Sequence, residues 1–201
     1  MAQEPSQTPW WQRALRIGSL SFVLAVAVSY ISNLTLAKVP AFVAFLVVLL
    51  LVGIGVAFDI LGTSVTAAEQ VPLNAMAAKR VAGARQGLWL VRNADRVANF
   101  ANDVVGDVAS AVTGAAGTTV ALQISGMVGA GDLTNRIFTL GVVGLIAALT
   151  VGGKAAGKTF AIEHATDVVL VAGRVLYGFE RLTGRSLTGG RGPSSSRRRT
   201  T

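Results

Sequence analysis

Apolar residues gather in four long stretches of the chain, at residues 17–37, 41–58, about 96–124 and 133–151. Residues 41–58 form an unbroken apolar run. Eighteen residues of helix extend about 27 Å, which is enough to cross the hydrocarbon core of a bilayer. The third stretch is less uniform and begins with polar side chains. This pattern predicts an all-α, polytopic membrane protein with four transmembrane helices.

Composition agrees with this fold class. The chain has 201 residues, of which 52% are hydrophobic and 14% charged, and its mean hydropathy is +0.57. There is no cysteine and only one histidine, His164, which excludes disulfides, thiolate metal sites and sites with several histidines. A bound metal would meet oxygen ligands, which suit Mg²⁺ or Ca²⁺. We see no nucleophile–base pair or phosphate-binding loop and expect no enzymatic activity.

The first apolar stretch follows a polar segment, residues 1–16, that ends with Trp10-Trp11, Arg13 and Arg16. Tryptophan at headgroup level before an apolar run is typical of an interfacial anchor. A cleaved signal peptide is the alternative, but the apolar run is long for one and the cleavage site near Ala37 is weak. We therefore interpret 17–37 as a transmembrane helix.

Two segments are too charged to span a membrane but apolar enough to lie on its surface, at residues 70–92 and 165–185. We expect both to form amphipathic belt helices beside the membrane domain. Residues 188–201 are rich in Gly, Ser and Arg, which predicts a disordered basic tail. The run Arg197–Arg199 is interpreted as a retained cytoplasmic charge cluster, so no nucleic-acid partner is expected.

Basic residues predict the orientation. Sixteen of the 18 lysine and arginine residues lie before the first span, between the second and third, or after the fourth. Only Lys38 and Arg136 fall in the other two loops. The positive-inside rule then places both termini in the cytoplasm of a protein of the inner or plasma membrane.

The third stretch carries acids and amides into the bilayer. Asn99, Asp103 and Asp107 recur at i, i+4 and i+8 and so share one side of a helix, with Asn102 beside them. Small residues recur at the same spacing: Gly106, Ser110, Gly114 and Thr118. Unpaired carboxylates in a membrane are costly and require a cation partner, either a basic side chain or a metal ion. Alternatively, the acids lie near the interface in partial contact with water, and Asn102 makes a structural bond between helices.

Polar groups also follow the second and fourth spans. Asp59 precedes the hydroxyl-rich segment 62–66, and Gly152-Gly153-Lys154 is expected to stop the last span. In the predicted topology these two ends and the start of the third span lie on the cytoplasmic side. We therefore expect them to meet in one polar centre, built by Ser64, Thr66, Asn102, Asp103, Gly153 and Lys154.

Two stretches resemble a known family. They are MAAKRVAGARQGLWLVRNADRVANFANDVVGD, which runs into the third span, and GGKAAGKTFAIEHATDVVLVAGRVLYGF, which follows the fourth. With the Gly-Thr-Ser-Val-Thr run after the second span, they resemble the transmembrane domain of CNNM/CorB-type magnesium transporters. The resemblance covers residues 38–187. It implies a homodimer with a belt of juxtamembrane helices and a membrane site for Mg²⁺.

The resemblance also implies the ligands of that site. Ser64 and Thr66 match the family's hydroxyls, Asn102 its carboxamide and Gly153 its carbonyl donor. Lys154 stands where the family has a glutamate, and a lysine cannot ligate a cation. Three acids that this chain has near the same region, namely Asp59, Asp103 and Asp107, are additional candidates. The first span is additional to the family's three, and the nucleotide-sensing CBS pair is not expected.

Three functions remain open at this point. The chain moves or senses Mg²⁺ or a related divalent cation. Alternatively, it is a non-transporting membrane scaffold derived from the same fold, with the Lys154 ammonium in place of the ion. The third hypothesis is a proton- or sodium-coupled pathway that uses Asp103 and Asp107.

Overall fold

The computed structural model describes residues 9–36, 38–128 and 132–184, and every regular element within these ranges is helical. The elements are α1 (Trp10–Leu36), α2 (Ala41–Ala67), α3 (Gln70–Ala78), α4 (Ala84–Arg92), α5 (Ala94–Ala98), the π-helix η1 (Asn99–Gly106), α6 (Asp107–Val128), α7 (Asp132–Glu163) and α8 (Ala165–Thr183). The all-α fold class is confirmed.

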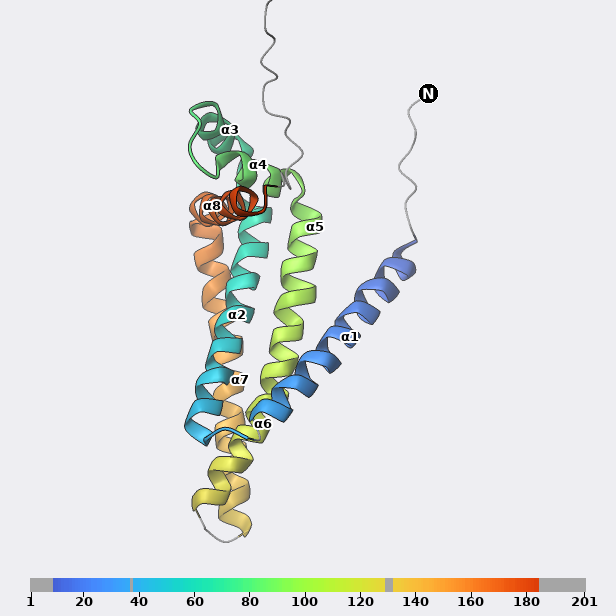
Figure 1. The fold of residues 1–201 in the computed structure, drawn as a ribbon, viewed down its shortest axis with the longest axis vertical. Helices are drawn as coiled ribbons and strands as arrows, with labels where there is room; N and C mark the ends of the chain where they lie inside the picture. The colour runs from blue at the N-terminus through green and yellow to red at the C-terminus, as the bar shows by residue number, and fades with distance from the viewer. Residues whose placement is uncertain (1–8, 37, 129–131, 185–201) are drawn as a thin grey trace, which may run out of the picture.

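Helices α2, α6 and α7 run side by side along the long axis of the molecule, with α5 and η1 continuing the line of α6 (Figure 1). Four helical segments are long and apolar enough to cross a membrane, at Ala14–Leu36, Ala41–Ala67, Ala94–Met127 and Leu133–Glu163. They correspond to the four predicted spans. The chain is a multi-pass membrane protein.

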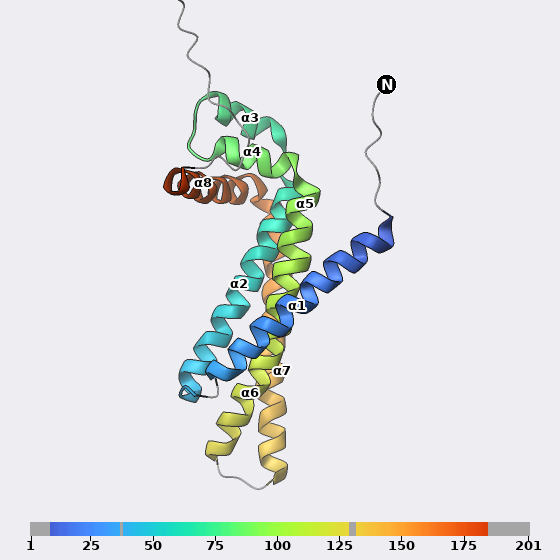
Figure 2. The same ribbon diagram turned by 45° about the vertical axis from the view of Figure 1, so that its right-hand side comes forward.

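Helix α1 packs against α6 and, over a smaller area, against η1. Leu36 is buried in an apolar cluster with Val48 of α2 and Val120 of α6, and Gln123 Nε2 donates a hydrogen bond of 2.9 Å to the Leu36 carbonyl. Toward its N-terminus the helix leans away from the other spans in both views (Figures 1 and 2). Phe22 and Tyr30 are accordingly exposed, as expected for side chains that face lipid.

The predicted belt gathers at one end of the bundle, where α8 lies across the ends of α2 and α7, and α3 and α4 lie above it (Figure 2). Its apolar core joins Val65 of α2, Leu73 of α3, Leu88 of α4 and Val169 of α8. The crossing of α4 and α8 depends on glycine. Any Cβ on Gly173 would overlap the backbone of Gly83, which itself has a φ of 84°.

Three predicted boundaries are wrong. The second span does not end before Asp59, because α2 continues as one helix through the hydroxyl-rich segment to Ala67. Gly152-Gly153 does not stop the fourth span either, and α7 continues to Glu163. Glycine is tolerated inside a packed membrane helix because it lets another helix approach. The segment 70–92 forms two helices, separated by a turn in which Arg80 and Gly83 have positive φ.

Two expectations fall on residues outside the described ranges. They are the disordered tail at residues 188–201 and the first half of the N-terminal segment, residues 1–8. The second belt helix matches its prediction closely, since α8 begins at Ala165 and ends at Thr183.

Candidate cation site

The third span changes its helical form where its polar residues enter the bundle. Between α5 and α6, residues Asn99–Gly106 form the π-helix η1 rather than continuing the α-helix. A π-helix contains more residues per turn, so it shifts side chains out of the i, i+4 register and often marks a functional site. The prediction of one regular helix across this region is therefore wrong.

An acid and an amide both lie at the α2–η1 interface, each near a glycine of the opposite helix. The Asn102 carboxamide of η1 lies against Gly62 of α2, where an added Cβ would overlap it. The Asp59 carboxylate of α2 lies near Gly106 of η1, where an added Cβ would be in van der Waals contact with Asp59 Oδ1 at 3.9 Å. Asn102 therefore occupies the space that Gly62 leaves on α2.

Both side chains bury an oxygen atom that has no hydrogen-bond partner among the described residues. Asp59 is 5% exposed, and its Oδ2 accepts no hydrogen bond there. The Oδ1 atom of Asn102 is likewise buried without a donor. Asp59 is eight residues before the end of α2, about 12 Å along the helix axis. Buried polar atoms are normally satisfied, so two unsatisfied oxygens at one interface call for an explanation.

Oxygen atoms of this kind favour a hard cation. Mg²⁺ keeps several of its waters in proteins and commonly takes one or two carboxylates. One carboxylate and one amide oxygen therefore suit a partly hydrated ion. A dense cluster is not formed, since the described residues contain no group of three or more His, Cys, Asp or Glu side chains placed to hold a metal. We call the pair Asp59 and Asn102 the oxygen pair.

Lys154 belongs to a different contact. Its Nζ is 3.2 Å from Asp107 Oδ1 and forms an ion pair between α7 and α6. The Lys154 side chain is 19% exposed and the Asp107 side chain 70% exposed. Lys154 thus meets Asp107, whereas the predicted polar centre grouped Lys154 with Asp103. This ion pair already neutralises one of the two acids of the third span.

Three other predicted ligands have structural contacts. Ser64 is buried, and its Oγ donates a hydrogen bond of 3.2 Å to the carbonyl of Ala161 on α7. Thr66 is exposed and donates to the carbonyl of Thr63 at 2.8 Å. An added Cβ on Gly153 would be 3.1 Å from Val56 Cγ2. Ser64 and Gly153 therefore both lie at the contact of α7 with α2, but they do not meet in one centre, because Ser64 contacts Ala161 and Gly153 packs against Val56, eight residues earlier on each helix.

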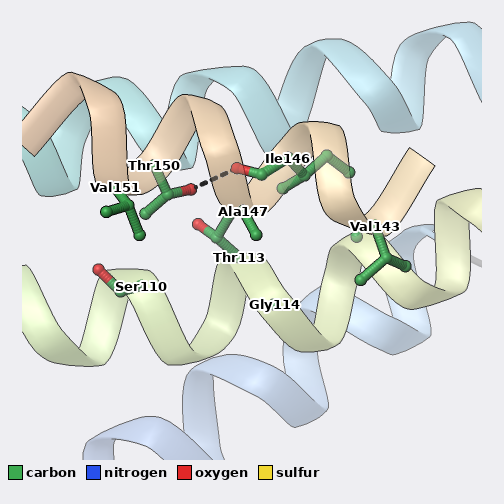
Figure 3. Close-up of a pocket in the computed structure, with 9 residues that line it drawn as sticks. Ser110, Thr113, Gly114, Val143, Ile146, Ala147, Thr150 and Val151 are labelled. Carbon is green, nitrogen blue, oxygen red and sulfur yellow. Dashed lines mark hydrogen bonds between the residues drawn. The ribbon is translucent and has the colours of Figure 1, made fainter. Parts of the chain in front are cut away.

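The acidic stripe of the third span lies on the exposed side of the protein. Asn99, Asp103 and Asp107 are all exposed, whereas Asn102 and Gly106 face α2. Below Asp107, the exposed side of α6 and α7 forms a shallow groove of about 240 Å³. Its lining is mostly small residues, including Ser110, Gly114 and Ala147 (Figure 3). The predicted polar centre is therefore divided between a buried oxygen pair and an exposed ion pair.

The two glycines next to the oxygen pair are not predicted as site residues. In the sequence Gly62 belongs to a hydroxyl-rich run and Gly106 to a stripe of small residues. Their pairing depends on the antiparallel register of α2 and η1, which no spacing within one segment encodes. A glycine three residues after an intramembrane acid, matched by a glycine four residues after an amide, is the signal that could have found them.

Comparison with protein-family models, curated proteins and solved structures finds no match for this chain.

Proposed function

We propose that this membrane protein binds a hard cation at the oxygen pair, and that it moves or senses Mg²⁺ or a related divalent ion. The observation that carries the proposal is the pair of buried, unpartnered oxygens of Asp59 and Asn102. An ionised carboxylate inside a bilayer is costly unless a cation compensates it. The only ion pair described for a lysine of the bundle joins Lys154 to Asp107 and leaves Asp59 without that compensation.

The helical form at the oxygen pair supports a functional site. Asn102 lies within the π-helix η1, and π-helical segments frequently occur at functional sites. The resemblance to CNNM/CorB-type transporters supports the same class of function, with Asp59 in the role of the acid that Lys154 replaces.

A measurement of Mg²⁺ flux distinguishes a transporter from a sensor. The purified protein is reconstituted into liposomes that contain a Mg²⁺-sensitive dye. If the chain moves Mg²⁺, the dye should respond when Mg²⁺ is added outside. Asp59→Asn should remove the response, because the neutral amide no longer compensates the ion. Asp103→Asn is the matched control, an exposed acid on the neighbouring helix, and should leave most of the flux. Ion binding without flux would support a sensor.

The second candidate is a scaffold that binds no ion, and the Lys154–Asp107 contact of 3.2 Å favours it. In that case the Lys154 ammonium takes the place of the metal ion. Mg²⁺ would then not change the melting temperature of the wild type, and Lys154→Glu would create Mg²⁺-dependent stabilisation. If the wild type itself is stabilised by Mg²⁺, the scaffold is excluded.

A homodimer is part of the proposal. The groove on α6 and α7 exposes Gly114 and Ala147, and small residues allow close approach of helices in a bilayer. Asp107 precedes Ser110, a residue of this groove, by three positions, and its side chain is 70% exposed. Exposure of a carboxylate to lipid is costly. A second copy across this face would shield it. We further propose the cytoplasmic placement of both termini, on the distribution of the basic residues.

A further inference from the structure

An apolar cavity lies between the belt and the bundle. It has a volume of about 410 Å³. Helix α2 contributes Ala57, Phe58 and Leu61, α4 contributes Leu90, and α8 contributes Ala172, Val175 and Leu176. Its size falls in the range of about 300–1,000 Å³ that is typical of small-molecule sites. No polar side chain is among the residues that line it.

The depth of the cavity indicates what fills it. Ala57 and Leu61 belong to the segment Ala41–Ala67, so the cavity borders a helix that is long and apolar enough to cross a membrane. Water gains nothing from an apolar wall with no hydrogen-bonding group. The apolar material available at this level is the acyl chain of a membrane lipid.

Charge on the belt indicates which lipid. Helix α8 exposes Val171, Val175 and Leu182 along one side and carries Arg174 and Arg181 on another. This is the composition of a helix that lies in the membrane interface. Basic side chains also outnumber acidic ones over residues 70–98. In the predicted orientation the belt faces the cytoplasmic leaflet, whose anionic lipids attract such segments.

We propose that the cavity under α8 binds one acyl chain of an anionic phospholipid, with its headgroup beside Arg174 and Arg181. The chain packs on Phe58, the residue before Asp59. This site is separate from the proposed cation site, and neither depends on the other.

Photolabelling in membranes tests the site. The full chain is reconstituted with phosphatidylglycerol that carries a diazirine in one acyl chain, and the labelled peptides are identified by mass spectrometry. We expect label on the lining residues of α2 and α8. Ala172→Phe fills the cavity and should lower that labelling several-fold. Val171→Phe adds the same ring at the adjacent position, which is 56% exposed, and should leave it unchanged.

The headgroup is tested with the same probe built on phosphatidylcholine. We expect weaker labelling than with phosphatidylglycerol, and loss of that difference when Arg174 and Arg181 are both changed to Gln.

Leu61→Trp blocks the cavity from the α2 side and replaces Ala172→Phe if that variant does not fold. Unchanged labelling in every cavity-filling variant that folds would overturn the proposal. Equal labelling by the two lipids would also overturn it. Disulfide-linked dimers of Val175→Cys in membranes would do the same, because a second copy would then cover the cavity.

Discussion

The Asn102 carboxamide of η1 fills the space beside the Cα atom of Gly62 on α2. The contact is close enough that no side chain other than hydrogen fits at Gly62 without displacement of Asn102. One turn along the same interface, the Asp59 carboxylate lies near Gly106 of η1. The amide and the acid therefore each contact the opposite helix at a glycine.

Replacement of Gly62 by alanine should destabilise the bundle. The new methyl group would overlap the end of the Asn102 side chain and displace its carboxamide from the interface, at a cost of about 1–3 kcal/mol for an overpacked interior. Gly53→Ala is the matched control on the same helix, because nothing lies within 4 Å of a Cβ there. Thermal unfolding in one detergent should give a lower melting temperature for Gly62→Ala only. An equal effect of the two substitutions would argue against the described register.

The Lys154–Asp107 ion pair should show thermodynamic coupling. Either Asp107→Asn or Lys154→Gln leaves a charge without its partner in the membrane, so each single variant should be less stable than the wild type. The double variant should recover part of the loss. The expected coupling is about 0.6–1.7 kcal/mol, the range for polar contacts between membrane helices. A double-mutant cycle from unfolding experiments measures it, and strictly additive effects would contradict the contact.

The proposed dimer can be tested with single cysteines, since the natural chain has none. Gly114→Cys and Ala147→Cys place a thiol in the groove between α6 and α7. Both should form disulfide-linked dimers in native membranes under mild oxidation. Phe42→Cys lies on the exposed side of α2 and should remain monomeric. A chain that is monomeric in native mass spectra from several mild detergents would count against the dimer.

Orientation is accessible to reporter fusions. Fusions after Gly129 and at Thr201 should report opposite sides of the membrane, because one more span separates them. The fusion at Thr201 should report the cytoplasm, on the distribution of lysine and arginine. If both report the same side, the four-span topology is wrong.

The sequence predicted the fold class because hydrophobic length is a local property. Four apolar stretches became four helices of the expected order, and the amphipathic segment after the fourth span became α8. Helix ends were predicted less well. Gly152-Gly153 is a stop signal in water, yet in the membrane Gly153 packs against Val56 and the helix continues.

The candidate site was predicted only in part, because it depends on contacts between segments. Convergence of the second, third and fourth spans followed from topology, and Asn102 faces α2 as expected for a site residue. The choice between Asp59, Asp103 and Asp107 did not follow. In the structure Asn102 and Gly106 face α2, while Asp103 and Asp107 stay exposed. Which side of the third span meets α2 depends on contacts between segments, and no spacing within one segment encodes it.

The most direct test of the oxygen pair is a Mg²⁺ titration of the melting temperature of purified protein. Wild type should be stabilised by millimolar Mg²⁺, since an ion that binds only the folded state raises stability by mass action. Asp59→Asn should lose this response, and the exposed-acid control Asp103→Asn should keep it. A wild-type melting temperature that does not change with Mg²⁺, or a response that Asp59→Asn retains in full, would contradict a cation site at Asp59 and Asn102.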